Sequence, residues 1–190
     1  MALLLAVLPQ IPEFVEAYDA ARDDLDRGRA FERLAGVRDA ALVPILAPHL
    51  TRASDPIRLK SAEVLGAQID DADAARALLV AVPAQTSPDV SAAMLRAFGG
   101  TDVESEARGI VPYLRGRNET LATVAAEVAG RVRAGVLVMP LMVRAAELDE
   151  GKLRDACLAA LRETTGQDLA TPQEYLAWWR EHRATFKDPE

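Results

Sequence analysis

The sequence predicts an all-α protein: a right-handed α-solenoid in which helix pairs stack on one another, with capping helices at its N- and C-terminal ends. Of the 190 residues, 36 are Ala, which has the highest helix propensity, and only 5% are aromatic, which disfavours a β-sandwich. One apolar pattern also returns every 31 to 33 residues, which is typical of stacked helix pairs. We expect a single domain over residues 10–190.

The composition argues against two classes of partner. The net charge is −7, whereas binding to nucleic acid needs a surplus of Lys and Arg, so we expect no nucleic-acid partner. No apolar run reaches the roughly 18–20 residues that span a bilayer, so we expect no membrane partner.

A short apolar segment, residues 1–9, precedes the first expected helix. It lacks the basic start and the clear cleavage site of a secretory signal, so one interpretation is a cap over the first helices. The other interpretation is the remnant of a signal whose true start lies upstream. We expect a cytoplasmic protein, and a periplasmic or secreted one if the second interpretation holds.

Two helices are expected before the repeats, as an N-terminal cap. Ile11, Phe14, Val15 and Tyr18 follow the i, i+3, i+4, i+7 spacing of an amphipathic helix over residues 10–21. A second helix is expected from about residue 25 to residue 34.

Four similar segments organise the rest of the chain, and their starts lie 33, 31 and 32 residues apart. The repeats cover about residues 38–67, 70–100, 103–132 and 134–166. Steps of four residues keep to one face of a helix, so the first, fifth and ninth positions of each segment are expected in the core. These core positions are Ile57, Ser61, Leu65; Val90, Met94, Phe98; Leu121, Ala125, Ala129; and Leu153, Cys157, Leu161.

Each segment follows another apolar helix, so every repeat is read as a helix pair. Pro44, Pro112 and Pro140 lie in three of these first helices. A proline inside a helix removes a backbone hydrogen bond and bends the axis, so we expect a recurrent bend.

Capping residues and glycines punctuate the expected helices. Asp55 and Ser87 precede Pro residues, which is typical of a helix N-terminus. Gly66, Gly99 and Gly130 lie near the ends of the second helices, where a left-handed residue is expected. The acidic residues from 70 to 73 are interpreted as helix N-terminal charges rather than calcium ligands.

The chain ends in a predicted cap helix over residues 171–186. Thr171 and Glu174 form a capping box with Pro172 in the first turn. Trp178 and Trp179 follow, and two interpretations stay open. The helix shields the open end of the last repeat, or its aromatic side chains anchor a partner.

No motif for catalysis or metal binding is found. His49 and His182 are far apart, and zinc, P-loop and serine-hydrolase patterns are missing from the sequence. Cys157 is the single cysteine and is interpreted as a small core residue. We therefore expect no enzyme activity, no metal and no cofactor.

The repeat resembles the HEAT-repeat family. The clearest match is Leu42-Val-Pro-Ile-Leu46, followed by Asp55-Pro-Ile-Arg58 and Ser61-Ala-Glu-Val-Leu-Gly66. The Thr-Gly-Gln-Asp168 tail followed by Trp178-Trp179 is similar to the ending of many bacterial HEAT-repeat proteins. The resemblance implies an α-solenoid that binds other proteins or peptides, and it brings no catalytic residues.

The expected function is a non-enzymatic scaffold that binds a protein or peptide along the concave surface of the stack, as a monomer. Two alternatives stay open: an accessory subunit of an enzyme, similar to the chaperone-like subunits of bilin lyases, and a structural module of a larger assembly. DNA binding, as in HEAT-like DNA glycosylases, would need a basic concave face, but the charges of the second helices nearly cancel.

The candidate partner-binding residues lie on the second helices of the repeats: Arg58, Glu63, Arg96, Thr123, Glu127, Arg154 and Asp155. Glu63, Arg96 and Glu127 fall in one exposed row of alternating charge. In one interpretation Arg96 bridges its two neighbours and stiffens the stack. In the other, the row orients a partner segment of mixed charge.

Overall fold

The computed structural model describes residues 8–101 and 103–187, and within these ranges the chain is helical without any β-strand. The all-α prediction is therefore confirmed. The chain divides into two compact units, one ending at Thr101 and one following it, and each is described by itself. The signal or cap proposed for residues 1–9 falls almost wholly outside the described residues. Within the described ranges, no helix combines the length and apolar character needed to cross a membrane.

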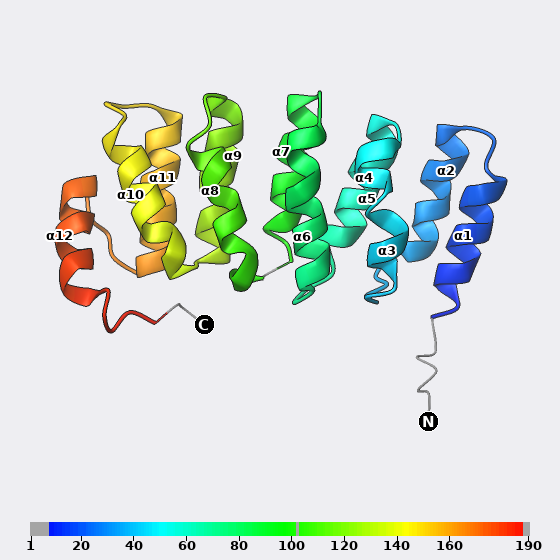
Figure 1. Cartoon of the computed structure of the whole chain (residues 1–190), viewed down its shortest axis with the longest axis horizontal. Helices are drawn as coiled ribbons and strands as arrows, with labels where there is room; N and C mark the ends of the chain where they lie inside the picture. The colour runs from blue at the N-terminus through cyan, green and yellow to red at the C-terminus, as the bar shows by residue number, and fades with distance from the viewer. Residues whose placement is uncertain (1–7, 102, 188–190) are drawn as a thin grey trace. The chain divides into compact units, whose positions relative to one another are not determined.

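The first unit consists of helix pairs packed side by side (Figure 1). Its elements are α1 (Gln10–Ala20), α2 (Asp24–Ala30), η1 (Phe31–Leu34), α3 (Leu42–Leu46), α4 (His49–Arg52), α5 (Asp55–Gly66), α6 (Ala72–Ala81), η2 (Val82–Ala84) and α7 (Pro88–Phe98). Helix α1 packs on α2, α4 on α5 and α6 on α7, and α5 lies between α2 and α7. Both predicted N-terminal helices are present, the second ending in the 3₁₀ turn η1.

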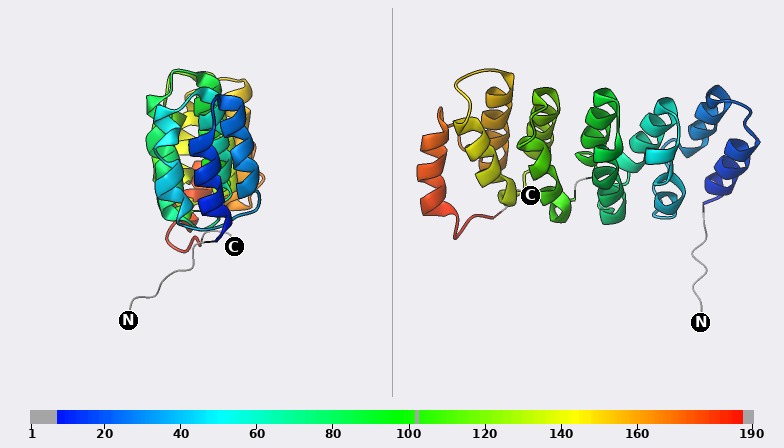
Figure 2. Two further views of the ribbon diagram at one scale, coloured as in Figure 1. Left: turned by 90° about the vertical axis from the view of Figure 1, so that its right-hand side faces the viewer. Right: turned by 45° about the horizontal axis from the view of Figure 1, so that its top comes forward.

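The second unit repeats this pairing. Its elements are η3 (Glu104–Ile110), α8 (Val111–Leu114), α9 (Glu119–Val132), η4 (Gly135–Leu137), α10 (Val138–Ala146), α11 (Lys152–Thr165) and α12 (Pro172–His182). Helix α8 packs on α9 and α10 on α11, and α9 and α11 lie against each other. Helix α12, red in Figure 2, packs on α10.

The predicted core positions are buried, with one exception. Ser61, Met94, Ala125 and Cys157, for example, are completely shielded from solvent. Leu121 is only half-buried, and the next residue in α9, Ala122, is buried in its place. The steps of four therefore identify the core face of the second helices but misplace the first position in the third repeat.

The prolines lie in the first turns of their helices, so the predicted mid-helix bend is wrong. Pro44 is the third residue of α3, Pro112 the second of α8 and Pro140 the third of α10. The 3₁₀ helices η3 and η4 lead directly into α8 and α10. Pro44 lies in the first turn of a helix that no 3₁₀ helix precedes, where proline is readily accommodated. Pro112 and Pro140 lie just after the change from 3₁₀ to α-helix.

The glycine prediction is also wrong. The glycines with a left-handed backbone conformation, at positive φ, are Gly36, Gly151 and Gly166. None of them is among the three glycines predicted at second-helix ends. Gly99 has a right-handed φ of −61°, and Gly130 lies inside α9. Only Gly166, which ends α11, fits the expected role of a left-handed helix stop.

Two of these glycines instead allow close helix contact. A Cβ atom on Gly66 would lie 2.8 Å from the carbonyl oxygen of Ala97 and 2.9 Å from its Cα, so α5 and α7 meet at backbone distance. A Cβ atom on Gly130 would lie 3.0 Å from the Cα of Ala160, on the facing helix α11. The two contacts occupy equivalent positions of the aligned repeats, one in each unit.

Most predicted N-caps are confirmed. The Ser87 hydroxyl accepts a hydrogen bond from the Val90 N–H at 3.4 Å, and Asp71 accepts from the first-turn N–H groups of α6. Thr171 forms its capping box at the start of α12. Asp55 is not an N-cap, because it is already the first residue of α5, and its carboxylate pairs with Arg58 at 3.4 Å.

Tyr175, rather than the tryptophans, anchors the C-terminal helix. Its side chain is fully buried, and its hydroxyl donates a hydrogen bond to the Gln167 carbonyl at 2.6 Å. Trp178 and Trp179 are half-buried. Their rings lie 6.1 Å apart, and Phe186 packs edge-on against both. The helix thus attaches through one tyrosine and carries an aromatic cluster beside it.

Candidate functional site

The second helices of the pairs in the first unit, α2, α5 and α7, border two grooves. The larger groove lies between α2 and α5 and has a volume of about 600 Å³, and it continues into a second hollow of about 380 Å³. Gly28, Glu32, Lys60 and Glu63 line both parts. The early residues of both helices line the first part and their late residues line the second, so α2 and α5 run in the same direction.

Leucine side chains make the α2–α5 groove apolar. Leu25 on α2 is 65% exposed and Leu59 on α5 is 41% exposed, although both are large apolar residues. Gly28 lines the same groove on α2, and no described atom outside its own stretch of helix lies within 4 Å of the place where a Cβ would stand. This open apolar surface is of the kind that marks protein-interaction sites.

The α5–α7 groove, of about 440 Å³, brings Glu63 and Arg96 together. Glu63 does not pair with Arg96, however. Its carboxylate lies 3.1 Å from the Nζ of Lys60, one turn earlier on its own helix. Arg96 forms no ion pair with any residue that the structure describes. The interpretation in which Arg96 bridges Glu63 is therefore wrong, and the Arg96 guanidinium is exposed.

The second unit has a corresponding groove between α9 and α11, of about 270 Å³. Glu127 lines it with Arg131, Arg133 and Glu163, above a floor of alanines and Gly130. The guanidinium of Arg133 lies 3.7 Å from the Glu163 carboxylate. Each unit thus has a groove over its close glycine contact, with charged residues at the rim.

Three predicted residues lie outside these grooves. The Thr123 hydroxyl donates to the Glu119 carbonyl of its own helix at 2.8 Å. Arg154 is half-buried and Asp155 exposed in the first turn of α11. The structure does not bring these three side chains together with Glu127 in one groove.

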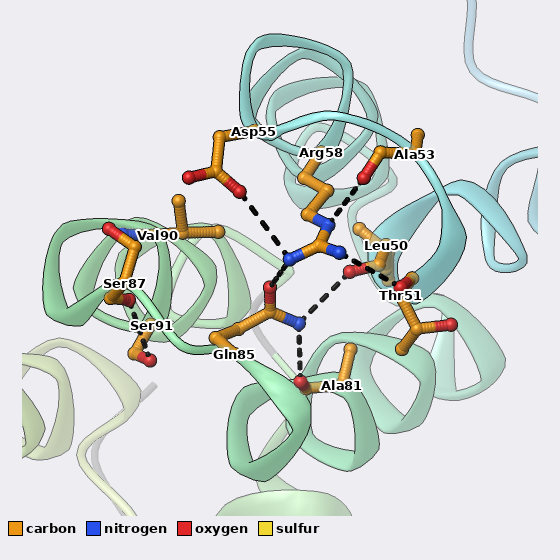
Figure 3. A network of polar contacts seen from close by, with 10 residues as sticks. All are labelled: Leu50, Thr51, Ala53, Asp55, Arg58, Ala81, Gln85, Ser87, Val90 and Ser91. Carbon is orange, nitrogen blue, oxygen red and sulfur yellow. Dashed lines mark hydrogen bonds and ion pairs between the residues drawn. The ribbon is translucent and has the colours of Figure 1, made fainter.

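Arg58 is committed to an internal network and is not available to a partner (Figure 3). Its side chain is only 17% exposed. Nε donates to the Ala53 carbonyl at 2.7 Å and Nη2 to the Thr51 carbonyl at 3.0 Å, so α5 is tied to the end of α4. Nη1 donates to the amide oxygen of Gln85 at 3.0 Å.

Gln85 extends this network to the next helix pair. Its amide nitrogen donates to the carbonyls of Leu50, at 2.9 Å, and Ala81, at 2.7 Å. Arg58 and Gln85 together satisfy four backbone carbonyls from the ends of α4 and α6. In the sequence, nothing distinguishes Gln85 from an ordinary loop residue.

Burial shifts the pKa of several titratable side chains. Burial raises the pKa of the Cys157 thiol to about 12, so it is protonated at neutral pH and inert. His49 stacks on Tyr18 with ring centroids 4.6 Å apart, and burial lowers its pKa. No cluster of three or more metal-ligand side chains occurs in the part of the chain that the structure describes.

The α2–α5 groove was not among the sequence-based candidates, although Glu63 lies on its wall. Leu25 and Leu59 fall at exposed positions of their helices, and an exposed leucine in a helix is a common event. The signal is that Leu25, Gly28 and Leu59 line one groove, which only the packing of α2 on α5 brings about.

A scan against models of protein families finds none that matches this chain, and a search of curated proteins finds no matching sequence.

Proposed function

We propose that this chain is a non-enzymatic scaffold that binds a protein or peptide partner through the grooves between its second helices. The observation that carries the proposal is the α2–α5 groove, which exposed Leu25 and Leu59 line together with charged side chains. A contiguous apolar surface with a polar rim is the usual composition of a protein-binding site. The partner would be recognised by apolar contact, with the charges fixing its orientation.

The same proposal includes the architecture. We infer a right-handed HEAT-like α-solenoid, in which every second helix contributes to one concave surface. The recurrence of the glycine–alanine contact supports it, since Gly66 faces Ala97 in one unit and Gly130 faces Ala160 in the other. Repeated contacts at repeated positions are expected where each pair stacks on its predecessor.

The proposed scaffold needs no cofactor, works as a monomer in the cytoplasm, and uses neither nucleic acid nor membrane as its partner. The buried, protonated Cys157 thiol agrees with a role without covalent chemistry. The exposed charges Arg96, Glu127 and Asp155, together with half-buried Arg154, remain the candidates for orienting the partner.

Affinity capture from a lysate of the native host tests this function. The immobilised full chain would be compared with Leu59→Asp, which places a charge in the groove, and with Val80→Asp. Val80 is 71% exposed on α6, away from the second helices, and serves as the matched control. We expect the wild type and the control to capture a partner that Leu59→Asp loses at an unchanged melting temperature. Equal capture by all three chains, or capture of nothing, would contradict the proposal.

A further inference from the structure

No packing contact among the residues that the structure describes accounts for Gly28. A glycine in a helix destabilises it relative to alanine. Gly66 and Gly130 compensate for this by allowing close contact with a neighbouring helix, but a Cβ on Gly28 would meet nothing within 4 Å. Gly28 instead lines both parts of the α2–α5 groove. An unfilled space over a helix glycine is what the close approach of another backbone requires.

Each wall of the groove carries a cation followed one turn later by a carboxylate. On α2 and η1, Arg29 is followed one turn later by Glu32, and on α5, Lys60 is followed one turn later by Glu63. Because α2 and α5 run in the same direction, the cation comes before the carboxylate along both walls, and Glu32, Lys60 and Glu63 line both parts of the groove. Asp24, further towards the helix starts, is already paired with Arg27 at 3.3 Å.

These charges are available to a partner. Glu32 has no ion-pair partner among the residues described. Arg29 pairs with Asp26 and Lys60 with Glu63, but both pairs are largely exposed, and exposed pairs of neighbouring residues contribute little. A ligand that presents an acidic group to the two cations and a basic group to the two carboxylates would therefore replace these weak ion pairs with complementary contacts.

We propose that the α2–α5 groove docks an amphipathic α-helix of a partner protein. The inference rests on the proposed scaffold function and names its partner class. A small residue of that helix passes over Gly28, and its leucine-like side chains contact Leu25 and Leu59. An acidic side chain faces Arg29 and Lys60, and a basic side chain one turn away faces Glu32 and Glu63.

A helix fits this pattern better than an extended segment. On each wall the cation and the carboxylate are three residues apart. Side chains of a helical partner share one face at the same spacing. An extended chain places alternate side chains on opposite faces, with a rise of about 3.3 Å per residue, and does not reproduce that spacing. Helix-in-groove binding also uses apolar anchors at i, i+3 or i+4, and i+7. Such anchors would contact Leu25 and Leu59.

The probe is a displayed peptide library with two parts, one of amphipathic helical peptides and one of extended peptides. Both would be selected against the full chain. Kd for the winning peptides would then be measured by fluorescence anisotropy with the wild type, Gly28→Ala, the double variant Lys60→Glu/Glu63→Lys, and the control Val80→Asp. Melting temperatures of all four chains establish that each variant is folded.

We expect helical winners that carry an acidic and a basic residue one turn apart. Gly28→Ala should weaken them at least about tenfold while its melting temperature rises, since the added methyl supports α2 but occupies the space above it. The double variant reverses the charges of the α5 wall only, so each partner charge then meets one attractive and one repulsive side chain. It should weaken the helical winners by a similar factor and gain no preference for the charge-reversed peptide. Val80→Asp should bind like the wild type.

Several results would overturn the inference. Winners that are extended, or that bind Gly28→Ala as tightly as the wild type, would place the partner elsewhere. If such winners instead lose affinity on Arg96→Glu, the scaffold function stands and only the α2–α5 helix site is wrong. If neither part of the library yields a binder, the helix site and the scaffold function fail together.

Discussion

Replacing Gly66 with Ala should destabilise the first unit, although alanine is the better helix former. The new Cβ would stand 2.8 Å from the Ala97 carbonyl oxygen and 2.9 Å from the Ala97 Cα, both backbone atoms that cannot rotate away. Overpacking of this kind lowers the free energy of unfolding by up to about 3 kcal/mol, and the upper end applies because the crowded atoms belong to the backbone. The higher helix propensity of alanine restores about 1 kcal/mol. The expected net loss is about 2 kcal/mol, which is about 4–8 °C in melting temperature for a chain of this length.

Urea unfolding followed by far-ultraviolet circular dichroism measures this change. Gly28→Ala is the matched control, because it adds the same methyl to a helix of the same unit where nothing lies within 4 Å. It should raise the stability by about 0.5–1 kcal/mol. Gly130→Ala should fall between the two, since its nearest neighbour would be 3.0 Å away. If Gly66→Ala is as stable as Gly28→Ala, α5 and α7 are not in backbone contact and the reasoning is wrong.

Three further changes test other parts of the fold. Arg58→Ala removes the donors to two backbone carbonyls and to Gln85, so unfolding free energy should fall by about 2–4 kcal/mol; a loss below about 1 kcal/mol would contradict the network. Ser61→Ala removes a fully buried hydroxyl without a hydrogen-bond partner, so stability should rise by up to about 1 kcal/mol, and a loss larger than that would show an unseen partner. Burial lowers the pKa of His49, with Arg27 acting in the same direction and Asp19 against it. The unfolded chain therefore takes up the proton more readily, and stability should decline as the pH falls below about 6.5, the pKa of an unperturbed histidine. His49→Gln should flatten this decline relative to the wild type, and an equal slope in both chains would refute the assignment.

The core of the second helices was predictable because its signal is local. A step of four residues keeps to one helix face, so Met94, Cys157 and their counterparts are identified without knowing what covers them. The capping box at Thr171 is likewise local, since its donors and acceptors lie within three residues of one another.

The roles of Gly66 and Arg58 were not predictable, because they depend on how neighbouring elements pack. A glycine near a helix end fits both a left-handed stop and a close contact, and only the position of Ala97 distinguishes the two at Gly66. Arg58 has the sequence environment of an exposed helical residue. Two of its acceptors are the nearby carbonyls of Thr51 and Ala53, to which the turn between α4 and α5 folds it back. The third is the amide oxygen of Gln85, which tertiary packing brings within 3.0 Å.

The location of both tryptophans in α12 determines what tryptophan fluorescence reports in this protein. The chain has two Trp residues, and both belong to the second unit, at half-buried positions beside Phe186. Their emission therefore follows the attachment of one helix, whereas circular dichroism averages over helices of both units. Coincident unfolding curves from the two signals would mean that the units unfold as one cooperative system, and separated curves would give the stability of each unit without cutting the chain.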